Sequence, residues 1–360
     1  MFAAISRPIR AVRAPATRAY ASATRDDGAR GGARTLDGAR AVCKLAMVSY
    51  WDVGQRGFFP DDDDDDAEGA DDARVNFATP FGFEPLIGDG RALRDEVMRA
   101  MGPGFHARAW LDGSTKTTRA GVFRSGPAAR DWVVAAFRGT TPSPLRGLFR
   151  ESQINGRAGQ VTWAAGDVRG RVHAGYSEAY ARIKGDIEDA VRREMDTTAT
   201  AKTKIVICGH SLGGALATLC AASLAKEYGG ECEIECVTFG QPRVGDTEFC
   251  ESLDAQSLHY ARVVHGGDLF ARVPTSGVWF PTSNEGRFGV EFAHAGSMFW
   301  TDSTGASAHT YVPKGGGDPD GFSTDIRMAN PVRVANDHSG YARFLDDPSV
   351  DAHWPEGGLI

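Results

Sequence analysis

The chain of 360 residues lacks any apolar run that approaches the roughly 18 residues of a membrane-spanning helix, so the sequence predicts no transmembrane segment. It also lacks an excess of basic residues. The formal net charge is −7, which excludes a nucleic-acid-binding protein that relies on bulk positive charge. Hydrophobic residues make up 42% of the chain, which is enough to form a globular core. We therefore expect a globular protein without nucleic-acid partners.

Cysteine is scarce. The six cysteines are too irregularly spaced for a disulfide framework, and we expect free thiols in a reducing compartment. Cys232 and Cys236 could form a disulfide or bind a metal, but a single pair without a second is a weak zinc signal. No other set of residues indicates a metal or an organic cofactor, and the sequence predicts none.

Acidic residues are absent before Asp26, whereas five arginines and many alanines and serines precede it. This composition, without the long apolar core of a secretory signal, is typical of a transit peptide for a plastid or a mitochondrion. If the segment is only a disordered basic tail, the protein is cytoplasmic. We expect residues 1–37 to be transit peptide and linker, residues 38–345 one folded domain, and residues 346–360 a C-terminal tail.

Six consecutive aspartates occupy residues 61–66. Such a block repels itself, which favours a solvated acidic loop over residues 61–72. A calcium site is the alternative, but the run lacks the glycine turn and the alternating ligands of a calcium-binding loop.

Strand and helix patterns alternate along most of the domain. After a helix at 39–50, a hairpin and a third strand are expected, followed by three strands that are each preceded by a helix. The expected strands are 105–111, 119–124, 131–137, 204–208, 235–239 and 260–264, and the later helices are 177–195, 214–226 and 247–253. This alternation predicts an α/β fold with a mostly parallel central sheet and helices on both faces.

Ser211 lies in a Gly-x-Ser-x-Gly pattern between Gly209 and Gly213. By chance the pattern is common, and an ordinary serine at a bend is the alternative. Here, however, a β-branched apolar run precedes it and an alanine- and leucine-rich run without proline follows it. A sharp turn from strand to helix exposes a serine hydroxyl as a nucleophile, so Ser211 is a candidate catalytic residue.

A nucleophilic serine needs a base and an orienting carboxylate. Reactive groups of parallel sheets gather beyond the carboxyl ends of the strands, where Asp268 follows the strand at 260–264. Asp246 also follows a strand and is the rival. In the usual order of serine, acid and histidine, the base lies late in the chain. The candidates are His294, His309, His338 and His353, of which His338 precedes an aromatic-rich helix start, His309 lies in a stretch typical of an exposed turn, and His353 lies near the C-terminus.

Six segments occur in the order found in the class 3 (fungal-type) lipases, a branch of the α/β-hydrolase superfamily, and the chain resembles that family over roughly residues 39–345. The segments are 137–140, 172–180, 208–215, 238–246, 262–268 and 337–341. The resemblance implies that Ser211 is the nucleophile, Asp268 the orienting acid and His338 the base. It also implies that Asp246 belongs to a structural segment.

The oxyanion of an acyl-transfer reaction needs preorganised donors. One is expected to be the amide of Leu212, directly after the nucleophile, and the resemblance points to Thr140 for the other. His210 beside the nucleophile and His173 in another matching segment are expected to be structural.

The resemblance also implies that residues 142–171 form a lid. Leu145, Leu148 and Phe149 share one helical face there, and a permanently packed surface helix is an equal alternative. The family's Trp and Asp-Leu pair are missing after the oxyanion turn. We expect a serine ester hydrolase that cleaves triacylglycerol or diacylglycerol at a lipid–water interface, in peripheral contact with a membrane or lipid droplet. The alternatives are a phospholipase A1 or galactolipase, and a non-catalytic lipid-binding protein of the same fold.

Overall fold

The computed structural model describes residues 32–50, 105–112, 118–126, 130–139, 159–274, 278–281, 287–301, 309–316, 318–319, 322, 334 and 337–359. Several sequence predictions lie outside these residues. They are the transit peptide, the aspartate run at 61–66, the oxyanion residue Thr140 and residues 142–158 of the expected lid.

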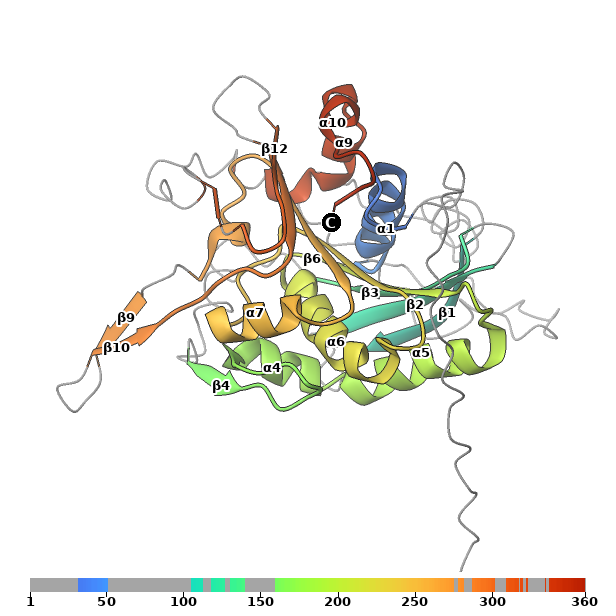
Figure 1. Cartoon of the computed structure of the whole chain (residues 1–360), viewed down its shortest axis with the longest axis horizontal. Helices are drawn as coiled ribbons and strands as arrows, with labels where there is room; N and C mark the ends of the chain where they lie inside the picture. The colour runs from blue at the N-terminus through green and yellow to red at the C-terminus, as the bar shows by residue number, and fades with distance from the viewer. Residues whose placement is uncertain are drawn as a thin grey trace, which may run out of the picture.

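Within the described residues, one large sheet runs through the molecule (Figure 1). Its strand order is β1-β2-β3-β6-β7-β8-β11-β12. Neighbours from β3 to β11 are parallel, and the strands toward either edge pair antiparallel. The strands are β1 (Phe105–Asp112), β2 (Arg119–Ser125), β3 (Trp132–Phe137), β6 (Lys204–His210), β7 (Ile234–Phe239), β8 (His259–Val264), β11 (Ser297–Thr301) and β12 (His309–Val312).

Helices cover both faces of this sheet, as the sequence predicts. Alternate residues of β3 separate the two layers, because successive side chains of a strand point to opposite faces. Val133 and Ala135 join a core cluster with α4 (Ala174–Ala181), α5 (Lys184–Thr198), α6 (Leu212–Tyr228) and α7 (Thr247–Asp254). Val134 and Ala136 join a second cluster with α1 (Leu36–Val48), α9 (Tyr341–Leu345) and α10 (Pro348–His353). The fold is that of an α/β-hydrolase.

Two minor hairpins complete the described structure. β4 (Gln160–Thr162) pairs with β5 (Arg171–His173), so the last part of the expected lid region forms a hairpin here. β9 (Val278–Pro281) pairs with β10 (Arg287–Val290), beyond a short 3-10 helix, η1 (Phe270–Arg272).

Several predicted elements need correction. The single helix expected at 177–195 is two helices, α4 and α5, because the chain turns at Arg182 and buries Ile183 in the core. Helix α1 begins at Leu36, before the expected start, because the Thr35 hydroxyl caps it by accepting a hydrogen bond from the Gly38 amide. His309, expected in an exposed turn, lies on β12 with its ring stacked on Phe299.

The C-terminal residues also differ from the expected tail. After α10, the indole of Trp354 donates a hydrogen bond to the carbonyl oxygen of Arg34 at 3.1 Å, and Leu359 is buried. Residues 346–359 therefore pack onto the domain, next to the start of its first helix.

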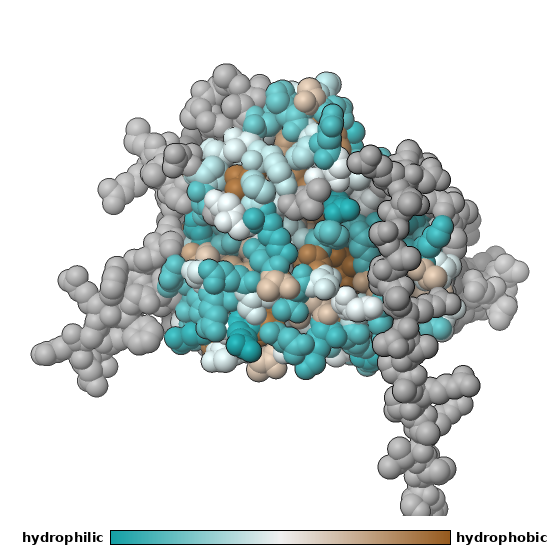
Figure 2. Space-filling view, in the orientation of Figure 1, coloured by the Kyte–Doolittle hydropathy of each residue, from teal (hydrophilic) through white to brown (hydrophobic). Residues whose placement is uncertain are grey.

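The described surface is mostly polar. Figure 2 shows a largely hydrophilic face with hydrophobic residues in small, separate areas. Among the described residues, Val161 is the large hydrophobic side chain that stands exposed, at 41%. No helix in the described part of the chain has both the length and the apolar character needed to cross a membrane.

Candidate active site

Ser211 occupies the sharp turn between β6 and α6. Its backbone has φ 58° and ψ −130°, a strained conformation for a residue with a side chain. The turn is tight: a Cβ atom on Gly209 would strike the carbonyl group of Gly213, and one on Gly213 would strike the carbonyl oxygen of Phe137. Both positions therefore require glycine. The structure thus has the strand-turn-helix arrangement that holds a nucleophilic serine.

Asp268 follows β8 and is completely buried. Its carboxylate accepts hydrogen bonds from the backbone amide of Phe270 at 2.9 Å and from the hydroxyl of Tyr341 at 2.7 Å. Nδ1 of His338 lies 2.9 Å from the same carboxylate. Burial alone would raise the pKa of Asp268, but the interactions with His338, Tyr341 and Phe270 outweigh it and hold the pKa below its ordinary value. Asp268 is therefore an ionised acceptor.

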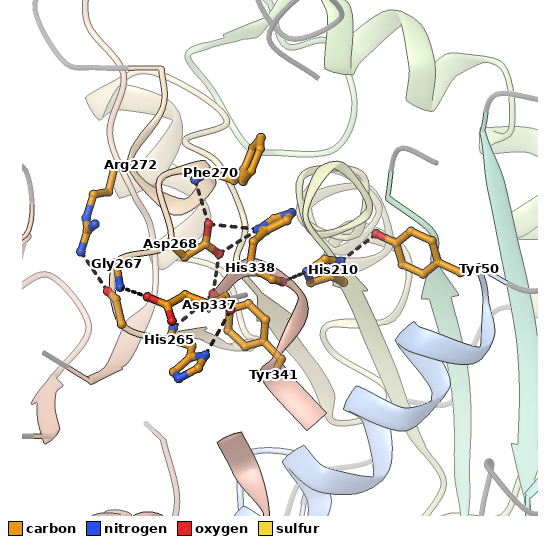
Figure 3. A network of polar contacts seen from close by, with 11 residues as sticks. Tyr50, His210, His265, Gly267, Asp268, Phe270, Arg272, Asp337, His338 and Tyr341 are labelled. Carbon is orange, nitrogen blue, oxygen red and sulfur yellow. Dashed lines mark hydrogen bonds and ion pairs between the residues drawn. The ribbon is translucent and has the colours of Figure 1, made fainter. Parts of the chain in front are cut away.

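His338 is held in one orientation. Its ring lies 4.0 Å from that of Phe270 and 4.5 Å from that of His210, measured between centroids. Because Nδ1 is engaged by Asp268, Nε2 is the ring nitrogen that can take a proton. Figure 3 shows His338 between Asp268 and His210.

Asp246, the rival acid, has a different task. It caps α7, accepting hydrogen bonds from the amides of Phe249 at 2.8 Å and Arg171 at 3.0 Å. The other three candidate bases also have separate partners. His294 Nε2 contacts the carbonyl oxygen of Ala271, His309 contacts Thr301 and Ser349, and His353 contacts Ser349. Of the four histidines, His338 is the one in contact with Asp268.

His210 connects the sharp turn at Ser211, called the elbow below, to His338, the candidate base. Its Nε2 lies 2.7 Å from the carbonyl oxygen of His338, and its Nδ1 lies 2.7 Å from the hydroxyl of Tyr50. Burial and the neighbouring His338 lower the pKa of His210 to about 3. Since His210 directly precedes Ser211, these bonds connect the turn of Ser211 to the segment that carries His338. His173, the other histidine expected to be structural, caps α4 by accepting a hydrogen bond from the Gly175 amide.

The two expected oxyanion residues differ in how far the structure describes them. Leu212 is the first residue of α6, where backbone amides point out of the helix end. Thr140 lies outside the described residues, and its role stays a prediction. Gly139, directly before it, passes close to the elbow: a Cβ atom there would crowd the Tyr50 hydroxyl, the His210 carbonyl oxygen and the Ser211 side chain.

Sequence reasoning missed three residues that support Asp268 and the segment of His338, the candidate acid and base. Tyr341 and Phe270 bind Asp268 directly, and Asp337 accepts a hydrogen bond from the Gly267 amide at 2.7 Å. Asp337 thereby links the loop that carries the base to the loop that carries the acid (Figure 3). The signal for Asp337 and Tyr341 is their place one and three residues from His338. No comparable signal marks Phe270.

A resident metal finds no ligands in the described part of the chain. There, no three or more His, Cys, Asp or Glu side chains are grouped so that they could hold an ion. The six cysteines are free thiols, and five of them are buried.

Comparison with known proteins points in one direction. Residues 134–277 match the family model described as "Lipase (class 3)". A secreted mono- and diacylglycerol lipase 1 of Fusarium solani is 32% identical over 207 residues, covering 57% of this chain and 56% of the relative. Phospholipase A1-II 4 of Oryza sativa subsp. japonica is 33% identical over 184 residues, covering 47% and 46%. The chain thus spans about half the length of these curated relatives.

A solved structure extends the likeness to the fold. The Rhizomucor miehei lipase, in complex with its propeptide, superposes with a TM-score of 0.52 at 22% sequence identity. The superposition covers 69% of this chain and 70% of that chain.

Proposed function

We propose, from the match of residues 134–277 to the class 3 lipase family model, that this chain is a serine carboxylic ester hydrolase acting on glycerolipids. One observation carries the proposal: the buried Asp268–His338 pair is joined through His210 to the strained turn of Ser211. A serine at a bend with no catalytic task would need none of these partners.

The residues support a two-step acyl transfer. Ser211 Oγ attacks the ester carbonyl carbon while Nε2 of His338 takes its proton, and Asp268 stabilises the imidazolium through Nδ1. The amide of Leu212, together with Thr140, would bind the oxyanion. Collapse breaks the ester bond, and His338 returns the proton to the leaving alcohol. Water, deprotonated by His338, then attacks the acyl-serine, and the free carboxylic acid and Ser211 are released.

The names of similar proteins support the substrate class. We propose triacylglycerol or diacylglycerol, since a Fusarium relative is named for mono- and diacylglycerol and a similar solved structure is that of a triacylglycerol lipase. A second candidate is the acyl ester of a phospholipid, which the rice relative favours through its name, phospholipase A1. The enzyme would act at a lipid–water interface by peripheral contact.

Labelling of the serine tests the catalytic proposal. We expect a fluorophosphonate probe to label the wild-type protein and Ser257→Ala equally, because Ser257 is exposed and distant in sequence from the elbow. Ser211→Ala should lose labelling and at least about a thousandfold of its esterase rate, since the nucleophile is gone. Mass spectrometry of the labelled peptide is the measurement.

The same preparations resolve the substrate. Dispersed trioleoylglycerol, dioleoylglycerol, phosphatidylcholine and monogalactosyl-diacylglycerol are compared by fatty-acid release. Fastest release from the first two supports the lipase, and fastest release from phosphatidylcholine or from the galactolipid supports the second candidate. If the wild-type protein neither takes the label nor releases fatty acid, the enzyme proposal is wrong and a non-catalytic lipid-binding protein is the remaining alternative.

A further inference from the structure

Tyr50 lies two residues after the end of α1, and it reaches the active site from outside the six segments that carry the family resemblance. Its side chain is 8% exposed and tilts toward His210, with ring centroids 5.7 Å apart. The Tyr50 hydroxyl lies 2.7 Å from Nδ1 of His210. On the far side of that ring, Nε2 lies 2.7 Å from the carbonyl oxygen of His338 (Figure 3).

The carbonyl oxygen of His338 determines which ring nitrogen of His210 carries the hydrogen, and the Tyr50 hydroxyl binds the other nitrogen. A carbonyl oxygen can only accept a hydrogen bond, so Nε2 carries the hydrogen and donates to His338. In a neutral ring Nδ1 then has a free lone pair, and the Tyr50 hydroxyl must donate to it. Burial and the nearby His338 lower the pKa of His210 to about 3, so the ring stays neutral at the pH where a histidine base works.

We propose that Tyr50 is a positioning residue of the active site: its hydroxyl fixes the ring orientation of His210, which in turn holds the backbone of His338 through Nε2–H. The proposal rests on the function proposed above, because it gives Tyr50 a task only if His338 is the base. Without the hydroxyl, Nδ1 becomes a buried acceptor with no donor, and the ring loses one of the two hydrogen bonds that hold its orientation.

A second contact supports the assignment. Gly139 approaches the Tyr50 hydroxyl so closely that a Cβ atom would collide with it, and the same atom would also meet the His210 carbonyl oxygen. Gly139 directly precedes Thr140, the proposed oxyanion residue. The hydroxyl therefore lies between the ring that supports the base and the backbone that leads to the oxyanion residue.

Removal of the hydroxyl alone tests this role. We expect Tyr50→Phe to lower kcat on a soluble p-nitrophenyl ester about tenfold, because the hydrogen bond that orients His210, and through it His338, is lost. KM should change less than about twofold, because Tyr50 makes no proposed contact with the substrate. Tyr180→Phe is the matched control. Tyr180 is also buried, and its hydroxyl donates one hydrogen bond, to Glu188 at 2.9 Å, on the other face of the sheet. Tyr180→Phe should lower the free energy of unfolding about as much as Tyr50→Phe does, but should leave kcat unchanged.

Two further measurements separate positioning from general loss of structure. Nuclear magnetic resonance of the histidine rings should show the hydrogen of His210 on Nε2 in the wild type, and the Nδ1 resonance should shift in Tyr50→Phe because that nitrogen loses its hydrogen-bond donor. In addition, Tyr50→Phe should have little further effect on kcat in a His210→Ala background, because Tyr50 acts through that ring.

The outcomes distinguish this inference from the proposed function. A wild-type protein without esterase activity would overturn the proposed function. An active wild type whose Tyr50→Phe variant matches Tyr180→Phe, or whose His210 carries its hydrogen on Nδ1, would overturn the role of Tyr50 and leave the catalytic assignment intact.

Discussion

A buried carboxylate is expensive unless donors surround it, and Asp268 has three kinds of donor. A backbone amide, a phenol and an imidazole all reach it, which keeps it ionised in a fully buried site. The neighbouring His210, by contrast, is neutral. Each side chain therefore has one stable protonation state, and His338 is left as the group that can exchange a proton with a substrate.

Asp268 can be tested directly against its rival. Asp268→Asn should lower kcat about ten-thousandfold, because the Asn amide would donate to Nδ1 of His338 and force the hydrogen onto Nε2, the wrong tautomer for a base. Steady-state rates with a soluble ester are the measurement, and an unchanged melting temperature would exclude unfolding.

Asp246→Asn is the control for that substitution. Asn and Asp cap helices equally well, so its bonds to Phe249 and Arg171 persist, and both kcat and stability should stay close to wild type. If Asp246→Asn instead abolished turnover while Asp268→Asn did not, the acid would be misassigned.

Among the secondary-structure elements, the parallel strands do most to assemble the site. Ser211 follows β6 and Asp268 follows β8, with β7 between them, so both residues lie beyond the same carboxyl edge of the sheet. His338 comes from a segment outside the sheet, just before α9, and Asp337 ties that segment to the acid loop.

The close packing at the elbow predicts that a larger residue at Gly213 destabilises the protein. Gly213→Ala would push a methyl group into the carbonyl oxygen of Phe137, part of the sheet backbone, and should lower the free energy of unfolding by about 3 kcal/mol. Gly185→Ala is the matched change, since Gly185 also lies in the first turn of a helix but has open space around it. It should raise the free energy of unfolding by up to about 1 kcal/mol. Urea denaturation measures both, and equal effects would contradict the proposed crowding.

Sequence patterns predicted the strands that carry the site better than the segments around them. The β-branched runs of β3, β6, β7 and β8 stand out because both faces of these strands are buried. The break between α4 and α5 has neither glycine nor proline to announce it, so periodicity continued through it. The short edge strand β12 gave no pattern. Tyr50 carried no signal, because its contact with His210 joins segments 160 residues apart.

At the scale of the whole molecule, packing around the sheet holds two histidine rings, His210 and His294, largely away from water. Burial and His338 lower the pKa of His210 to about 3, and burial with the nearby Arg262 and Arg243 holds the pKa of His294 well below its ordinary value. In the unfolded chain both rings titrate near their ordinary pKa of about 6.5. Unfolding below that pH therefore requires the uptake of protons.

The sign of the pH dependence follows. Because the folded pKa values are depressed, the stability from these neutral rings is complete above pH 6.5 and is lost as the pH falls toward about 3. At pH 5 the unfolded state should bind one to two more protons than the folded state, so the free energy of unfolding should fall by about 1.4 to 2.7 kcal/mol per pH unit. Buried Glu235 and Asp254 oppose this trend, since their raised pKa values let the folded state bind protons first.

Urea denaturation at half-unit steps from pH 7.5 to 4.5 measures this slope. His294→Gln should reduce it by about one proton, because the amide can still donate to the Ala271 carbonyl oxygen but no longer titrates. A free energy of unfolding that stays level or rises between pH 6.5 and 4.5 would mean that the buried carboxyl groups, rather than the histidines, govern the acid stability of this molecule.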